Sequence, residues 1–168
     1  MLAEPPPEAP QPDAPGSIVP SLTLKKRLKA PPARVWAAWT QPAQLAAWFG
    51  PGPTRDAHAE IDLRVGGRFL ARFTGETGEQ HQVGGHYQEI VPEQRLVFTW
   101  AWHSTPERVS RVTVTLKPDG AGTLLTLLHE KFADTTARDN HGRGWSGTLA
   151  KLVAWVEGAA WGRRETPS

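Results

Sequence analysis

The last apolar pattern in the chain has the spacing of an α-helix. Trp145, Leu149, Leu152 and Val156 follow one another at intervals of four, three and four residues, which places them on one helical face. We predict that this helix covers residues 135–157, with Asp134 as its N-cap. At ~1.5 Å per residue it would be longer than ~30 Å, enough to cross a small domain.

Over residues 21–29 and again over residues 57–129, apolar and polar side chains largely alternate, which is the pattern of half-buried β-strands. The clearest example is Leu96, Phe98, Trp100 and Trp102. The predicted strands are residues 21–29, 57–65, 68–74, 81–91, 95–103, 108–117 and 123–129. Turns are predicted at residues 66–67, 75–78, 92–94 and 117–120, and the glycine pair at 84–85 predicts a bulge or a close backbone approach.

Two short helices are predicted after the first strand. One begins near Pro32 and places Val35, Trp36 and Trp39 on a single face. The other carries Leu45, Trp48 and Phe49, and the Gly-Pro-Gly-Pro sequence at residues 50–53 ends it. Many strands closed by one long helix predict an α+β fold, in which a curved antiparallel sheet of about seven strands wraps around the helix and leaves a cavity.

The composition fits one domain with a tail. Residues 1–17 are rich in proline, so we predict a disordered tail there, a folded domain over residues 18–161 and a frayed C-terminus over residues 162–168. Eight tryptophans among 168 residues are more than a core of this size requires. Some of these rings are therefore available to contact a ligand.

Charge and residue usage exclude several classes of function. The 19 basic and 17 acidic residues give a net charge of +2, too balanced for a nucleic-acid-binding protein. The absence of cysteine excludes disulfides and thiol chemistry, and the six histidines lack metal-binding spacing, so we predict no metal and no cofactor. We also predict no membrane association and a cytoplasmic location, because the chain has neither an apolar run of ~20 residues nor a secretory signal at its start.

A combination of short motifs resembles a known family. They are Ala30-Pro31-Pro32 with Val35-Trp36, Trp48-Phe49-Gly50-Pro51, residues 63–69, residues 85–90, residues 92–100, and His141 with Gly144-Trp145. Over residues 21–158 the chain resembles the homologues of the activator of heat-shock protein 90 ATPase, within the SRPBCC (START-like, helix-grip) superfamily. This resemblance implies the helix-grip fold. Members of the superfamily bind lipids, hormones or polyketides, and some stimulate a chaperone.

The predicted function is non-enzymatic binding of a small hydrophobic or aromatic molecule between the sheet and the last helix. The predicted ligand-binding residues come from both short helices, the strands and the last helix: Trp36, Trp48, Phe69, Phe73, Tyr87, Phe98, Trp100, Leu127, His129, His141, Trp145 and Leu149. His129 and His141 would form hydrogen bonds with the ligand from the cavity wall. The alternative for these side chains is a filled core without a ligand.

Two other functions stay open. The resemblance implies a partner that stimulates a chaperone ATPase in the stress response, acting through its outer surface. A cyclase- or dehydratase-like enzyme would use His129 or His141 as its base, although no catalytic motif supports covalent chemistry. The sequence leaves the oligomeric state open between a monomer and a homodimer.

Overall fold

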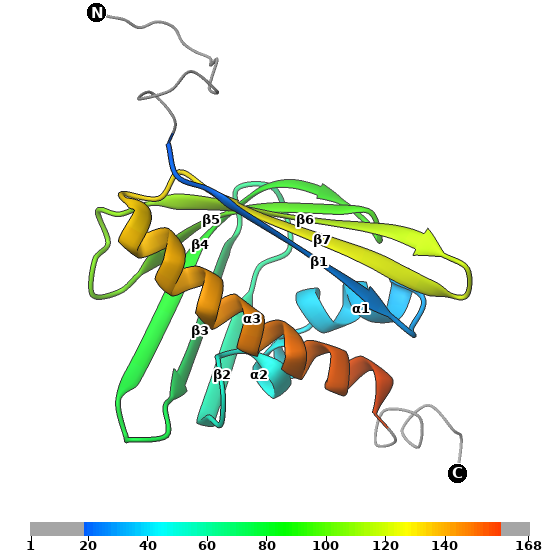
Figure 1. The fold of residues 1–168 in the computed structure, drawn as a ribbon, viewed down its shortest axis with the longest axis horizontal. Coiled ribbons are helices and arrows are strands. Elements are labelled where there is room, and N and C mark those ends of the chain that lie inside the picture. Colours follow the sequence, from blue (N-terminus) through cyan, green and yellow to red (C-terminus); the bar gives the residue numbers. More distant parts are fainter. Residues whose placement is uncertain (1–18, 159–168) are drawn as a thin grey trace, which may run out of the picture.

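The computed structural model describes residues 19–158, and the predicted tail, the frayed C-terminus and the outermost residues of the predicted domain lie outside this range. Seven strands and three helices follow in the predicted order (Figure 1). The elements are β1 (Leu22–Leu28), α1 (Pro32–Thr40), α2 (Pro42–Trp48), β2 (Arg55–Ile61), β3 (Arg68–Thr74), β4 (Gln80–Val91), β5 (Arg95–Trp102), β6 (Ser110–Asp119), β7 (Gly122–Glu130) and α3 (Thr135–Glu157).

The strands form one curled antiparallel sheet in the order β1-β7-β6-β5-β4-β3-β2. Helix α3 runs diagonally across one face of this sheet, and α1 and α2 lie on the same side (Figure 1). The predicted α+β architecture, a curved sheet gripping a long C-terminal helix, is confirmed. Among residues 19–158, no helix combines the length and the apolar character needed to cross a bilayer.

Several predicted boundaries are confirmed, and most of the others differ from the structure by one or two residues. Strand β3 and helix α3 have the predicted limits, and Asp134 caps α3 by accepting a hydrogen bond of 2.8 Å from the Ala137 amide. The strand predicted over residues 57–65 ends at Ile61, because the backbone folds into turns over residues 62–67. The turn predicted over residues 117–120 is shorter, because β6 continues to Asp119 and only Gly120 and Ala121 connect it to β7.

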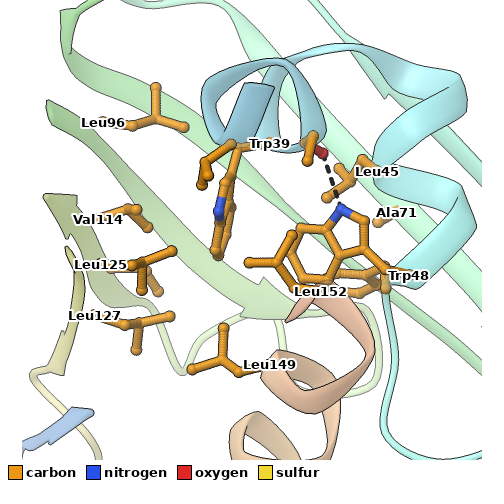
Figure 2. Packing of buried hydrophobic residues seen from close by; sticks show 14 of the residues in the cluster. Trp39, Leu45, Trp48, Ala71, Leu96, Val114, Leu125, Leu127, Leu149 and Leu152 are labelled. Carbon is orange, nitrogen blue, oxygen red and sulfur yellow. Dashed lines mark hydrogen bonds between the residues drawn. The ribbon is translucent and has the colours of Figure 1, made fainter. Parts of the chain in front are cut away.

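Proline placement fixes the junction of α1 and α2. Pro42 has no amide hydrogen, so the Ala38 carbonyl in the last turn of α1 cannot receive the usual helical hydrogen bond. The Trp48 indole Nε1 supplies the missing donor at 3.0 Å (Figure 2). This bond joins the end of α2 to the last turn of α1, in a region where both residues are almost completely buried.

Aromatic and branched apolar side chains fill the centre of the sheet–helix interface. The Trp39 and Trp48 rings meet edge to face with their centroids 4.8 Å apart. The centroid of the Trp39 ring also lies 6.1 Å from that of Trp145 in α3. From α3, Leu149 and Leu152 extend toward the leucines of the sheet (Figure 2). The Trp39 indole Nε1 is buried and has no hydrogen-bond partner among the described residues.

Trp48 and Trp39 form a matched pair for testing this arrangement. Changing either tryptophan to phenylalanine removes a similar volume, but only Trp48→Phe leaves the buried Ala38 carbonyl without a donor. We expect Trp48→Phe to lower the free energy of unfolding by about 1–3 kcal/mol more than Trp39→Phe does. Urea unfolding of the two variants measures this difference, and equal losses would contradict the role assigned to Trp48.

Candidate functional site

A cavity of about 520 Å³ opens at one end of the interface between the sheet and α3. It lies among the loop of residues 50–53, the hairpin between β3 and β4, the end of β5 and the first half of α3. Its apolar wall consists mainly of the aromatic rings of Phe49, Phe73, Trp100, Trp102 and Trp145. Its polar side chains include Glu76, Glu79, His81, Ser104, Asn140 and His141.

The middle of the interface is almost solid. Phe69, Tyr87 and Phe98 border a void of only about 20 Å³, and the Phe69 and Phe98 rings pack with centroids 5.0 Å apart. A void of this size holds at most about one water molecule. Space for a larger molecule therefore lies at the end of α3 that carries His141, away from the middle of the sheet.

The structure brings four of the predicted binding residues to the wall of this cavity: Phe73, Trp100, His141 and Trp145. Phe69, Tyr87 and Phe98 surround the small void instead. Trp48, Leu127, His129 and Leu149 are buried in the core, and Trp36 is partly exposed and packs against the outside of that core.

Several lining residues were absent from the sequence-based prediction. Trp102 alternates with Trp100 on the same face of β5, so the strand pattern contained the signal for it. In the sequence, the glycines and prolines of residues 50–53 indicate the end of a helix and give no sign of a cavity wall. Glu76, Glu79 and His81 come from a hairpin whose position over the cavity depends on the curl of the sheet, which no local pattern in the sequence reveals.

His129 is buried at the centre of a hydrogen-bond network. Its Nδ1 accepts a hydrogen bond of 3.0 Å from the Trp145 indole, which can only donate. Its Nε2 therefore carries the proton and donates to Ser110 Oγ at 2.7 Å, and this hydroxyl donates to the Trp100 carbonyl at 3.2 Å. The network requires a neutral imidazole with its proton on Nε2.

His141 has the opposite tautomer. Its Nδ1 lies 2.7 Å from the Ala137 carbonyl, which only accepts, so this nitrogen carries the proton. Its Nε2 accepts from the Trp102 indole at 2.9 Å and lies 3.3 Å from the Trp100 indole nitrogen. Each histidine thus uses its single lone pair on an indole, and either would have to release that partner before acting as a base.

Burial acts on the protonation of both rings. It lowers the pKa of His129 to about 2, an effect to which the adjacent His141 adds. Burial also lowers the pKa of His141, and the hydrogen bond to the Ala137 carbonyl opposes part of this shift. Both imidazoles are therefore neutral at physiological pH, as their hydrogen bonds require.

A lysine holds the loop that forms one wall of the cavity. Lys151 of α3 donates from Nζ to the carbonyls of Gly50 at 2.9 Å and Gly52 at 2.7 Å. It also lies 3.4 Å from Thr54 Oγ1, and burial lowers the pKa of its ammonium group. The loop is therefore attached to α3 by a charge-assisted contact.

Among residues 19–158, the lining of the cavity includes two carboxylates and no lysine or arginine. Thr77 Oγ1 donates a hydrogen bond to Glu79, which lowers the pKa of that carboxyl group, and His81 lies 3.6 Å from the same side chain. The cavity therefore carries negative charge without a lysine or arginine in its lining to compensate. Within the described part of the chain, no group of three or more His, Cys, Asp or Glu side chains is arranged to hold a metal ion.

Comparisons with known proteins identify relatives of this chain. The profile of the family described as activator of Hsp90 ATPase homolog 1-like protein matches residues 29–157. The crystal structure of protein CV1439 from Chromobacterium violaceum is 32% identical, with a TM-score of 0.70 over 82% of this chain and 98% of that chain. Protein NE0264 from Nitrosomonas europaea is 28% identical, with a TM-score of 0.67 over 82% and 94%.

A third similar structure carries the family's name. The AHSA1 (SPO3351) protein from Silicibacter pomeroyi is 27% identical, with a TM-score of 0.69 over 80% of this chain and 96% of that chain. A search of curated proteins found no match.

The neutral histidines predict a loss of stability in acid. In the unfolded chain a histidine has a pKa of about 6.5. The contribution of His129 to the free energy of unfolding is therefore fully present above about pH 6.5. At lower pH this contribution decreases, because the unfolded state binds a proton that the folded state does not. For His129 alone we expect a loss of about 2 kcal/mol between about pH 6.5 and pH 4.5.

Urea unfolding at several pH values measures this loss. His129→Asn keeps an acceptor for the Trp145 indole but cannot be protonated in this range, so its stability should fall less steeply than that of the native chain. His58→Gln is the matched control, because His58 is exposed on β2, and its profile should follow the native one. Identical pH slopes for the native chain and His129→Asn would refute the prediction.

Proposed function

Because the chain belongs to the family of activator of Hsp90 ATPase homolog 1-like proteins, we propose that it binds a small, uncharged, largely aromatic molecule in the cavity at the His141 end of α3. The observation that carries this proposal is a cavity of about 520 Å³ whose apolar wall is built from five aromatic rings. Ligand cavities in proteins are concave and mostly apolar, with a few polar groups that orient the ligand.

The size of the cavity supports useful affinity. Burying ~300 Å² of apolar ligand surface at ~25 cal/mol per Å² stabilises the complex by roughly 7 kcal/mol before the cost of association. Flat rings would pack against Trp100 and Trp145, whose centroids lie 5.1 Å apart. Micromolar binding is consistent with these figures.

The charge of the cavity lining favours an uncharged ligand over an anionic one. Glu76 and Glu79 belong to the lining, and no lysine or arginine among the described residues does. Both carboxylates are exposed, so an anionic ligand would meet a modest repulsion that salt screens. Aromatic carboxylates should therefore bind more weakly than neutral molecules of the same shape.

A chaperone-stimulating role is the second candidate, and the family's description is the observation that favours it. Such a role would use the outer surface and leave the cavity unused. It remains a hypothesis for this chain, as do the cytoplasmic location and a role in stress. Enzymatic use of His129 or His141 has less support, because both lone pairs already accept indole hydrogen bonds.

Filling the cavity tests the ligand-binding proposal. Gly144 lines the cavity from α3, and a Cβ atom added there would meet no atom within 4 Å. We expect Gly144→Leu to weaken binding of uncharged aromatic compounds at least roughly tenfold without loss of stability, because leucine favours the helix by up to about 1 kcal/mol over glycine. Thermal shift and isothermal titration calorimetry with a panel of neutral bicyclic aromatics measure both effects.

Gly142→Ala is the control for this experiment. Gly142 lies on the same helix but outside the cavity lining, and a Cβ there makes an ordinary contact of 3.7 Å with Leu22. This variant should bind as the native chain does. Failure of the native chain to bind any compound in the panel would remove the proposal, as would undiminished binding by Gly144→Leu.

A further inference from the structure

The wall of the cavity contains one more indole donor than the neighbouring imidazoles can accept. Three indole N–H groups, from Trp100, Trp102 and Trp145, are directed at His129 and His141. Each imidazole is neutral and uses its own N–H on another partner, so each offers a single lone pair. Three donors therefore share two acceptors.

The distances show which donor is left with the weaker bond. Trp145 has the His129 lone pair to itself at 3.0 Å. Trp102 and Trp100 both approach His141 Nε2, at 2.9 Å and 3.3 Å. One lone pair cannot align well with two donors, and the longer of the two contacts is the weaker hydrogen bond. The Trp100 N–H is the poorly satisfied group.

The surplus donor and its acceptor belong to residues that form the cavity wall. Trp100, Trp102 and His141 all line the cavity, although the Trp100 side chain as a whole is only 4% exposed. A poorly satisfied donor in so buried a position carries a free-energy cost, which an incoming acceptor would recover. A hydrocarbon ligand would leave this cost in place.

We propose that the cavity selects aromatic molecules that carry a neutral oxygen acceptor, such as an aryl ketone, and that this oxygen accepts the Trp100 indole N–H while Trp102 keeps the His141 lone pair. The inference rests on the proposed ligand-binding function and adds the chemical class of the ligand. The lining carboxylates make a neutral acceptor preferable to a carboxylate, although both offer oxygen atoms.

Two planar isosteres test the proposal. 2-Acetonaphthone carries a carbonyl oxygen where 2-isopropenylnaphthalene carries a methylene group, and the two molecules otherwise match in shape. For the native chain we expect the ketone to bind roughly threefold to tenfold more tightly, the fold-change of a single hydrogen bond. Isothermal titration calorimetry measures both affinities, and 2-naphthoate, as the anionic member of the series, should bind more weakly than the ketone.

Removing either of the competing donors should abolish the preference. Trp100→Phe deletes the surplus donor, and Trp102→Phe frees the His141 lone pair for Trp100. In both variants the two affinities should become equal within about twofold, below the effect of one hydrogen bond. Trp155→Phe is the matched control, because Trp155 is outside the cavity lining and donates to Gln44, and it should keep the native preference.

The native chain offers a measurement that does not depend on the folding of these variants. In ¹H–¹⁵N spectra the Trp100 indole resonance should move on addition of the ketone and stay close to its free position with the alkene. Equal affinities in the native chain would overturn the inference and leave the proposed function standing. Binding of neither isostere would overturn both, and a ketone preference that persists in both phenylalanine variants would overturn the assignment to this indole pair.

Discussion

The hydrogen bond from the Trp145 indole to His129 Nδ1 determines where the long helix can lie. It joins α3 to β7 in a region closed to water, and His129 in turn bonds to Ser110 of β6. Because buried polar groups without partners are costly, sliding α3 along the sheet would break several bonds at once. The positions of His141 and Gly144 on the same helix, and with them one wall of the cavity, follow from this contact.

Unequal side-chain sizes along α3 explain why the interface is solid in one half and open in the other. From Leu149 to Val156 the helix presents branched side chains that interlock with the sheet. Five residues before Leu149, Gly144 contributes no side chain, and Lys151 holds the neighbouring loop away from the gap. Dense packing and empty space thus occur along the same helix.

The architecture could be predicted from periodicity because helices and strands differ in the spacing of their apolar residues. The limits of α3 and β3 followed directly from that spacing. The strand predicted over residues 57–65 was too long because Leu63 and Val65 continue the alternation but are exposed in turns, at 41% and 64%. Alternation assigns Phe98 and Trp100 to the same face, yet it cannot show that Phe98 packs into a solid core while Trp100 reaches a cavity. That distinction depends on contacts between distant segments, which also brought the hairpin carrying Glu79 to the site.

The glycine at position 85 gives the junction between β4 and β5 an influence on the cavity. A Cβ atom there would lie 1.9 Å from the Thr99 carbonyl oxygen, so β4 and β5 approach each other more closely than any other residue type permits. A register shift follows between Tyr87 and Glu89, and such irregularities bend a strand. The bend of the sheet around the cavity is therefore set partly by backbone contacts between β4 and β5. Substitutions at this contact between β4 and β5 would change which molecules fit, even if every aromatic residue of the cavity wall were kept.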